Sequence, residues 1–457
     1  MEKITPYMHS GLAYTENDVA SHATDIFESI QQEVSMKEQH LVAIRPETPS
    51  ERGPYDFKIH QRADQYIQTS QIRLYMKLKL ETTAGAVPAI TDGAGTCNLP
   101  GNSLFTRMEI DIGGKLISDL QCTHSNYKTY LETLLTYSKE ARNSHLSASG
   151  WDIDTSAHLD DVRFHIVADD KETHADNTEN KGLQTRRKIQ AFPFDVMIPL
   201  HFDFFNCDRL FPPGIDMILK LIRAEDGFLM MQPAAITKTF RIVISEMKLF
   251  VPYITVAANI VAHHRHLMLT KPVLLPIKKT EVRQHHYPAG LSNIYIANQY
   301  TNRMPKSLII GMVTANSYNG HVNSNPYNFQ HFNINHVQLK VNNFLVPIEP
   351  YTPDWKDSGP LYMRELRSFY DNIGIGTDNI GNAVTADLYK GGATLFAWDF
   401  SPDHCNGYHW HKREDGGHLD IDLKFKEATP VSITVLCFAV YDALVAIEKN
   451  MEVVVSY

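Results

Sequence analysis

Apolar and polar residues alternate along much of the chain, which is the pattern of a β-strand with one buried face. Between Ile72 and Leu80 every second residue is apolar, and the residues between them are Arg, Tyr or Lys. The same period of two recurs from His418 to Phe425. Such alternation is typical of antiparallel sheets with one wet face. Further strands are predicted at Arg107–Ile112, Phe240–Val251, Leu308–Val313, Val337–Val341 and Val431–Val440.

The helical period is rare. It is clearest where apolar residues follow one another at i, i+3, i+4, i+7 and i+8 from Tyr127 to Leu135, and Ser125 is the predicted N-cap of this helix. A second short helical stretch is predicted at Tyr362–Tyr370. Many strands and few helices predict sandwiches or barrels.

One strand–turn–strand pattern occurs twice, half a chain length apart. Residues 108–117 read MEIDIGGKLI and residues 337–346 read VQLKVNNFLV, with apolar residues at the same positions. The turn pairs Gly113-Gly114 and Asn342-Asn343 both tolerate the positive φ of a tight hairpin. Each hairpin is followed by one of the two predicted helices. The recurrence indicates two copies of one β domain.

The boundary between the two copies is expected near Pro252–Pro272. Two long polar stretches, Asn143–Gln190 and Tyr351–Tyr389, interrupt the predicted strands. Long insertions at strand ends are usually exposed and often carry contacts. The first 50 residues are expected to form a loosely structured arm.

The composition of the chain argues against several classes of function. The 457 residues carry a formal net charge of −9, which disfavours a protein that coats nucleic acid. The five cysteines, an odd number without a CxxC pair, argue against a disulfide framework or a zinc ribbon. The N-terminal residues lack the apolar core of a signal peptide, and no apolar stretch predicts a membrane span. We therefore expect a soluble protein made inside a cell.

A metal site is the main chemical alternative. His409, His411 and Glu414 form an HxHxxE pattern that is close to the cupin metal motif. Two histidines at i and i+2 on a strand face the same way and can share a metal ion. The spacing to the glutamate is short for a cupin, and the second cupin motif is not visible. An exposed loop is the simpler interpretation.

Two other motifs resemble ligand loops only in part. The glycine-rich run from Gly374 to Gly381 lacks the strand–loop–helix setting of a phosphate loop. Asp152 and Asp154 begin like a calcium loop, but Ala157 and Arg163 stand where a glycine and a glutamate are required. Both segments are expected to be surface loops.

Basic residues and histidines gather in three places. The cluster Arg186-Arg187-Lys188 is expected on a solvated face, because the chain is acidic overall. The histidines that flank the connector are expected at the surface or at an interface, where histidine titrates near neutral pH. They are His263, His264, His266, His285 and His286.

With these features in place, the chain resembles the major capsid (hexon-like) proteins of Polinton/Maverick elements and adintoviruses, and more distantly the double-jelly-roll capsid proteins of other double-stranded DNA viruses. The resemblance runs from about Tyr55 to the C-terminus. Five blocks carry it: Asn126–Thr136, Phe204–Leu221, Asn325–Val341, Ala383–Asp399 and Val440–Asn450.

The resemblance implies an all-β fold of two tandem eight-stranded antiparallel jelly-roll sandwiches, with a few short helices in long loops. The expected domains are an N-terminal arm at 1–50, a first jelly roll at 51–255, a connector at 256–270 and a second jelly roll at 271–457. The family's trimers form nearly hexagonal capsomers that tile an icosahedral shell. Such a protein acts by assembly in the virion and needs no cofactor.

The implied partners are further copies of the chain, in a homotrimer and between trimers, together with a penton or minor capsid protein. We expect Asn143–Gln190 and Tyr351–Gly417 to supply trimer contacts and the outward tower loops, and we expect no specific recognition of nucleic acid. No residue is assigned a catalytic, cofactor-binding or metal-binding role. Two alternatives stay open: a two-domain cupin-like metalloenzyme that uses His409 and His411, and a carbohydrate-binding β-sandwich.

Overall fold

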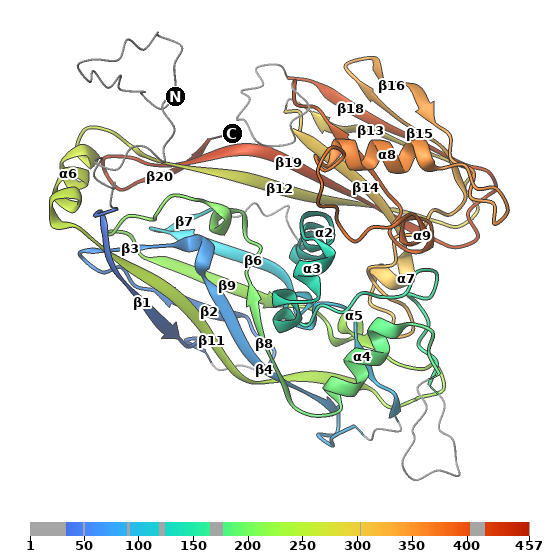
Figure 1. Ribbon diagram of the computed structural model, residues 1–457, viewed down its shortest axis with the longest axis horizontal. Coiled ribbons are helices and arrows are strands. Elements are labelled where there is room, and N and C mark those ends of the chain that lie inside the picture. The colour runs from blue at the N-terminus through green and yellow to red at the C-terminus, as the bar shows by residue number, and fades with distance from the viewer. Residues whose placement is uncertain are drawn as a thin grey trace, which may run out of the picture.

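The computed structural model describes residues 33–48, 51–88, 92–117, 124–164, 177–301, 303–402 and 416–456. Within these ranges the chain forms two antiparallel β-barrels that lie side by side, with helices between them and at their ends (Figure 1). None of the described helices is long and apolar enough to cross a membrane.

The first barrel consists of two facing sheets and an added short strand. One sheet has the order β1-β11-β4-β8, and β3 also pairs with β11. The other has the order β2-β9-β6-β7. The strands are β1 (Met36–Ile44), β2 (Tyr55–Ile59), β3 (Gln65–Ile67), β4 (Arg73–Thr82), β6 (Phe105–Ile112), β7 (Lys115–Leu116), β8 (Phe194–Pro199), β9 (Met217–Arg223) and β11 (Phe240–Val256); β5 (Gly95–Thr96) and β10 (Met230–Met231) pair separately.

The second barrel is built in the same way. One sheet has the order β12-β19-β14-β17, with β20 added to β19, and the other has the order β13-β18-β15-β16. The strands are β12 (Val273–Tyr287), β13 (Asn293–Thr301), β14 (Ser307–Thr314), β15 (Ile334–Val341), β16 (Phe344–Tyr351), β17 (Leu395–Asp399), β18 (His418–Phe425), β19 (Ile433–Ile447) and β20 (Val453–Ser456).

The two barrels have the same strand order. When the eight main strands of each barrel are counted along the chain, one sheet reads 1-8-3-6 and the other 2-7-4-5 in both barrels. This is the jelly-roll arrangement, in which two sheets enclose one core. The predicted fold class, two tandem antiparallel jelly rolls, is therefore confirmed.

The alternation in the sequence follows the two faces of the sheets. In β4 the side chains of Leu74, Met76 and Leu78 are fully buried, while Lys77 between them is exposed. In β18 every second residue from Leu419 to Phe425 is again buried, and Asp420 between two of them is buried as well. Apolar burial of this kind, at roughly 25 cal/mol per Å² of apolar surface, is the main force that holds each barrel closed.

The repeated hairpin is present in both barrels. Gly113 and Gly114 form the turn between β6 and β7, and Asn342 and Asn343 form the turn between β15 and β16. All four residues have positive φ, between 48° and 85°. This is the backbone that a two-residue hairpin of the right twist requires, and it explains why glycine and asparagine occupy equivalent positions.

Short helices fill the insertions between strands. The predicted helices correspond to α2 (Ser125–Thr136) and α8 (Met363–Asn372). Ser125 is not the N-cap of α2, as we had predicted; it lies inside the first turn, and its hydroxyl donates to Phe105 O over 2.8 Å. The other helices are α1 (Pro100–Ser103), α3 (Lys139–Arg142), α4 (Lys181–Gln190), α5 (Asp226–Leu229), α6 (Ala258–Met268), α7 (Ala315–Tyr318) and α9 (Ala386–Gly391), with 3-10 turns η2 (Thr69–Gln71), η4 (His145–Ser149) and η5 (Asp203–Asn206).

Two segments are more ordered than the sequence predicted. Strand β1 lies within the range 1–50, expected to be an arm, and pairs with β11 from Met36↔Val256 to Ile44↔Leu249, which makes it a strand of the first barrel. The connector between the barrels contains helix α6, which packs Val261 against Ile254 and Val256 of β11. Residues 1–32 of the arm lie outside the described residues.

Candidate functional site at the junction of the two barrels

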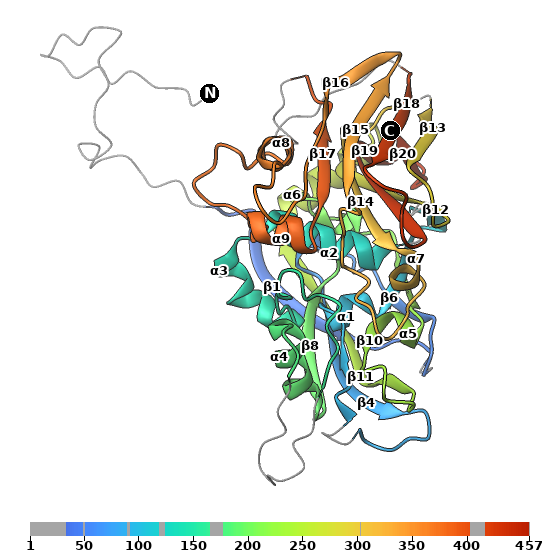
Figure 2. The same ribbon diagram turned by 90° about the vertical axis from the view of Figure 1, so that its right-hand side faces the viewer.

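The two barrels meet over a buried junction. We use this name for the segment 315–330 of the second barrel, which contains α7, together with α2, the 98–104 and 151–160 segments and α4 of the first barrel. Figure 2 shows α2 and α9 between the lower first barrel and the upper second barrel. The segment 325–330 belongs to a block, Asn325–Val341, that carries the resemblance described above.

Aromatic rings form the centre of the junction. Tyr327 of the second barrel is fully buried and stacks on Tyr130 of α2, with ring centroids 4.0 Å apart and planes 1° from parallel. Tyr127 of α2 meets the edge of the same ring at 5.6 Å. The Tyr327 hydroxyl pairs with Ser103 Oγ at 2.6 Å, so its polar end is satisfied. Stacked and edge-on pairs of this kind add about 0.5–1.5 kcal/mol each beyond burial.

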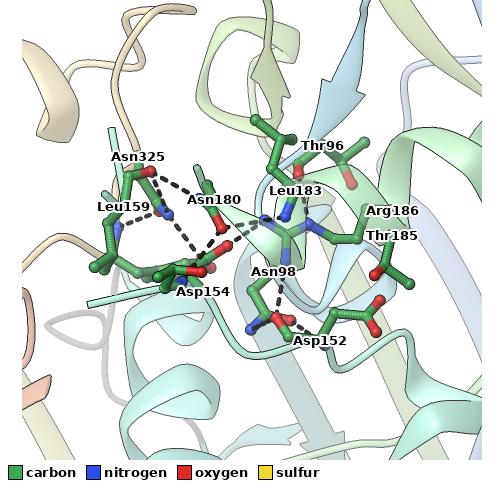
Figure 3. Close-up of polar contacts among 12 residues, drawn as sticks. Thr96, Asn98, Asp152, Asp154, Leu159, Asn180, Leu183, Thr185, Arg186 and Asn325 are labelled. Carbon is green, nitrogen blue, oxygen red and sulfur yellow. Dashed lines mark hydrogen bonds and ion pairs between the residues drawn. The ribbon is translucent and has the colours of Figure 1, made fainter. Parts of the chain in front are cut away.

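A buried ion pair lies beside these rings (Figure 3). Arg186 of α4 and Asp154 are both 2% exposed, and Arg186 Nη2 donates to Asp154 Oδ1 over 2.7 Å. The remaining donors of the guanidinium go to the carbonyl oxygens of Thr96 and Asp152, at 2.9 and 2.8 Å. The second carboxylate oxygen, Asp154 Oδ2, accepts from Asn325 Nδ2 of the second barrel at 2.9 Å. One carboxylate therefore ties α4 to the other barrel.

Asp160 of the first barrel is bound entirely by the second. Its Oδ1 accepts from the backbone N–H of Asn325 at 2.7 Å, and its Oδ2 accepts from Asn328 Nδ2 at 2.5 Å and Gln330 Nε2 at 3.3 Å. Burial raises the pKa of Asp160 above its ordinary value, and the hydrogen bonds from Asn325 and Asn328 oppose that rise. Three directional bonds to one carboxylate fix the second barrel in orientation as well as distance.

Glycines allow the backbones of the two barrels to touch. A Cβ at Gly227 would lie 2.6 Å from Gly320 O, and a Cβ at Gly320 would lie 2.7 Å from the backbone N of Phe228. Gly320 also has a φ of +82°. Gly391 is equally close to the first barrel, because its carbonyl accepts from Ala157 N at 2.7 Å. Only glycine fits such close backbone approaches.

A second charged cluster joins the barrels near the opposite side of α2. Lys128 Nζ, whose side chain is 3% exposed, donates to Asp203 Oδ1 at 2.5 Å and to His201 O at 2.8 Å. Asp203 Oδ2 accepts from the backbone N–H of Thr280 in β12 at 3.0 Å. Burial raises the pKa of Asp203 although Lys128 opposes the rise. These groups line a small pocket between the barrels together with apolar side chains such as Ile277.

The histidines of β12 lie at or near the junction. Tyr318 of α7 is hydrogen-bonded to His124 Nε2 at 2.9 Å, and its ring lies 4.9 Å from that of His286. Burial lowers the pKa of His124 and of His285 below the ordinary value. By contrast, His263, His264 and His266 are exposed on α6. The expected surface and interface positions of these histidines therefore divide between two separate regions.

The basic cluster on α4 was predicted wrongly. Arg186 and Arg187 are 2% and 6% exposed, and only Lys188 faces solvent. Arg187 donates to the carbonyl oxygens of Val162 and Arg163 at 2.8 and 3.0 Å. Carbonyl and carboxylate acceptors inside the junction compensate both guanidinium groups, so an acidic chain can bury them.

The partial motifs do not form ligand sites within the described residues. Asp154 of the calcium-like segment is occupied by Arg186 and Asn325, as described above. The glycine-rich run lies between helices α8 and α9 and follows no strand, and Gly374, with a φ of +85°, donates its N–H to Asp371 O. In the ranges that the structure describes, no group of three or more His, Cys, Asp or Glu side chains could hold a metal ion.

His409, His411 and Glu414 lie outside the described residues, as do Cys122 and Cys405. Cys97, Cys207 and Cys437 are buried and free. Burial raises the pKa of the Cys97 and Cys437 thiols to about 12. Thiols of this kind pack as small apolar groups and are poor nucleophiles.

Comparison with known proteins gives one distant match in sequence and clear matches in structure. No protein-family model matches the sequence. The chain is 19% identical over 407 residues to the uncharacterized protein F54H12.2 of Caenorhabditis elegans, a match that covers 87% of this chain and 91% of that protein.

Among solved structures, the chain is similar to a chain of the Sputnik virophage, with a TM-score of 0.63, 11% identity, and coverage of 98% of this chain and 94% of that one. It is also similar to the Faustovirus major capsid protein, with a TM-score of 0.58, 10% identity and coverage of 92% of each chain. The mavirus major capsid protein gives a TM-score of 0.50, 10% identity and coverage of 99% and 96%. Together with the matching strand order of the two barrels, these similarities identify the fold of this chain as a double jelly roll.

Proposed function

We propose that this chain is the major capsid protein of a double-stranded DNA virus or virus-like element, and that it assembles as a homotrimer. One observation carries the proposal: two barrels of identical strand order lie side by side and are locked by a buried junction. Three copies around a threefold axis would place six similar barrels in a ring. Such a ring has a nearly hexagonal outline, which can tile a large closed shell.

Exposed apolar side chains support the proposed trimer contacts. Ile189, in the insertion 143–190 of the first barrel, is 52% exposed. In the segment 351–417 of the second barrel, Leu361, Met363 and Ile380 are 69%, 56% and 69% exposed. Large apolar side chains that stay in water in one copy are typical of surfaces that another copy covers.

The edges of the second barrel are consistent with assembly through side chains. The edge strand β16 exposes Phe344 and Ile348, at 76% and 87%, but it also contains Pro347 and Pro350. Proline cannot donate to a neighbouring strand, so uncontrolled edge-to-edge pairing is disfavoured. A protein that assembles in many copies needs this protection against aggregation.

The finer parts of the proposal follow the sequence resemblance. They are a lineage with the Polinton/Maverick and adintovirus capsid proteins, a division into arm, first jelly roll, connector and second jelly roll, and a penton or minor capsid protein as a further partner. The proposed location is the virion. The proposed role is structural and requires no catalytic turnover.

The mass of the purified full-length chain in solution tests the proposal. Light scattering is expected to give three times the chain mass, and negative-stain images are expected to show hexagonal particles. A monomer at high protein concentration would contradict it.

The metalloenzyme alternative is tested separately by elemental analysis of the same preparation. Stoichiometric iron, manganese or zinc that is lost in His409→Ala would favour that alternative, and metal-free trimers would support the capsid role.

A further inference from the structure

A lysine and an aspartate of the first barrel are held against each other beneath the second barrel. Lys128 of α2, whose side chain is 3% exposed, donates from Nζ to Asp203 Oδ1 over 2.5 Å. A second hydrogen bond from the same nitrogen to His201 O, at 2.8 Å, fixes the position of the lysine. Condensation of such a pair to an amide requires an activated carboxyl carbon, a proton carrier and surroundings that exclude bulk water.

The second barrel activates the carboxyl group. The backbone N–H of Thr280 in β12 donates to Asp203 Oδ2 at 3.0 Å. A fixed N–H at this oxygen stabilises the negative charge that develops there when an amine attacks the carboxyl carbon. Burial raises the pKa of Asp203, which favours the neutral acid, the form that reacts with an amine. Because Thr280 belongs to the second barrel, this activation exists only when the two barrels are docked.

Glu132, one helical turn after Lys128, is placed to carry a proton. Its Oε1 lies 3.6 Å from Lys128 Nζ, and its Oε2 lies 2.8 Å from His201 Nδ1. Burial acts to raise the pKa of Glu132, but the neighbouring Lys128 and His201 outweigh burial and hold that pKa below its ordinary value. Glu132 is therefore a carboxylate beside the lysine nitrogen, and a carboxylate within reach of a proton can act as a general base.

Apolar side chains surround the pair. Phe202 and Phe204, on either side of Asp203 in the sequence, are buried. Together with Ile277 of β12 they line a cavity of about 30 Å³ that Lys128 and Asp203 also border, and this volume is enough for one water molecule. A buried ion pair costs desolvation free energy that a neutral amide does not cost, so these surroundings favour the condensed product.

We propose that Lys128 Nζ and Asp203 Cγ become joined by an amide bond in the folded chain, and that the structure shows the two groups before this bond forms. One proton passes from the ammonium to Oδ1 along their hydrogen bond, and the resulting amine attacks Cγ. The N–H of Thr280 holds the charge on Oδ2. Glu132 takes a second proton from Nζ and delivers it to Oδ1, which leaves as water when the Cγ–Oδ1 bond breaks.

The reaction is balanced without a further reactant. The third proton of the ammonium stays on the amide nitrogen, and Glu132 ends as the carboxylate that it was at the start. The amide would link α2 covalently to η5, and this link would restrict the unfolded chain and so stabilise the folded one. The inference concerns one copy of the chain and does not depend on the capsid proposal.

A second buried pair in the same chain lacks this activation. Lys306 Nζ lies 2.9 Å from Asp442 Oδ2, and the two side chains are 9% and 8% exposed. Among the described residues, however, Asp442 Oδ1 accepts no hydrogen bond. With no N–H at its second oxygen, this pair is expected to stay ionic, and it serves as an internal control.

The intact mass of the full-length chain, purified folded and then denatured for mass spectrometry, tests the proposal. It is expected to lie below the mass calculated from the sequence by one water molecule. Peptide fragmentation is expected to place the loss on a branched peptide that joins Lys128 to Asp203. Lys128→Arg keeps the positive charge but lacks the nucleophilic amine, so this variant is expected to have its full mass. Glu132→Gln is expected to lower the joined fraction severalfold, and Asp442→Asn is expected to leave it unchanged.

Three results would overturn the proposal. The first is a full mass in wild-type protein that circular dichroism shows to be folded. The second is a loss of water that persists in Lys128→Arg or that maps to another pair, such as Lys306 and Asp442. The third is an equal joined fraction in Glu132→Gln and wild type, which contradicts the role of Glu132. Circular dichroism of each variant shows whether a missing bond comes from unfolding, and the branched peptide of wild type is decisive without any variant.

Discussion

At the scale of single residues, the junction depends on buried charges that are fully paired. Arg186 uses its donors on Asp154 and on two carbonyl oxygens, and Asp154 uses its second oxygen on Asn325. A complete set of partners makes such a cluster tolerable, and removal of one partner leaves the other charged and unsatisfied. The cluster therefore gives specificity of orientation to an interface whose cohesion comes from the aromatic rings.

Arg186→Ala is expected to destabilise the protein strongly, because it leaves the Asp154 carboxylate buried without its counter-ion. The free energy of unfolding is expected to fall by about 3–5 kcal/mol. Thermal unfolding checks this against Lys188→Ala, an exposed change two residues away that is expected to stay within about 0.5 kcal/mol of wild type. Equal losses in the two variants would show that burial of the ion pair does not matter.

Gly320→Ala is expected to disturb the junction by a purely steric route. Its Cβ would lie 2.7 Å from the backbone N of Phe228, and its φ of +82° is strained for alanine. Thermal unfolding is expected to show a clear loss of stability. Gly381→Ala is the matched control, since a Cβ there meets nothing within 4 Å. If Gly320→Ala melts like wild type, the contact between the two backbones is not tight.

The arginines of α4 show where sequence reasoning reached its limit. The buried positions Leu183, Arg186, Arg187 and Gln190 follow the i, i+3, i+4, i+7 spacing of a helix face. That spacing was visible, but three of the four side chains are polar, and hydrophobic periodicity counts only apolar ones. The groups that accept hydrogen bonds from these arginines lie on segments distant in sequence, so no local pattern predicts the contacts.

At the scale of elements, the strands were largely predictable because each alternates with a period of two. The core positions of β4 and β18 and both two-residue turns agree with their sequence patterns. Strand β1 was missed because nearly all its residues are exposed, which leaves no buried face to give an alternation. Only its pairing with β11, more than 200 residues away, defines it.

The pairing of β4 with β11 carries a pH-dependent ionic contact. Glu246 of β11 lies 2.5 Å from Lys248 Nζ and 2.9 Å from Lys77 Nζ of β4. Hydrogen bonds from Lys248 and then Lys77 lower the pKa of Glu246 to about 2. An acid whose pKa is lower in the folded state stabilises the fold above its ordinary pKa and loses that effect as pH falls through its folded pKa.

Glu246→Gln is therefore expected to melt at a lower temperature than wild type at pH 6. This difference is expected to shrink as pH falls from about 4.5 towards 2, where wild-type Glu246 also becomes neutral. Melting curves across this range check the sign. Glu427→Gln, at an exposed position of the second barrel, provides the comparison. A difference that grows in acid would contradict the ionic contact.

At the scale of the whole molecule, the duplication of the barrel was predictable from one repeated hairpin and its spacing. The contacts of the junction between the barrels were not predictable. Tyr130 and Tyr327 sit in segments that read as a helix and a loop, and nothing local shows that their rings stack. The arrangement of two domains is a property of their contact surfaces. In this chain those surfaces combine aromatic, charged and glycine residues. No single sequence pattern relates these residues to one another.

Leu361→Asp together with Met363→Asp is expected to convert the proposed trimer to a monomer. Both side chains are more than half exposed, so the fold keeps its core while an intermolecular apolar contact gains two charges. Light scattering and thermal unfolding are measured on the same sample. Val87→Asp, which is 70% exposed and lies outside both insertions, is expected to remain trimeric. A trimer of unchanged mass in the double variant would show that the trimer contact lies on another surface.

The bonds that converge on Asp160 and Asp154 leave the angle between the barrels little freedom. In a shell built from this chain, bending within a subunit would break these buried contacts, so curvature has to be taken up where one capsomer meets the next. A shell of flat facets with sharp edges would then have a lower free energy than a smoothly rounded wall.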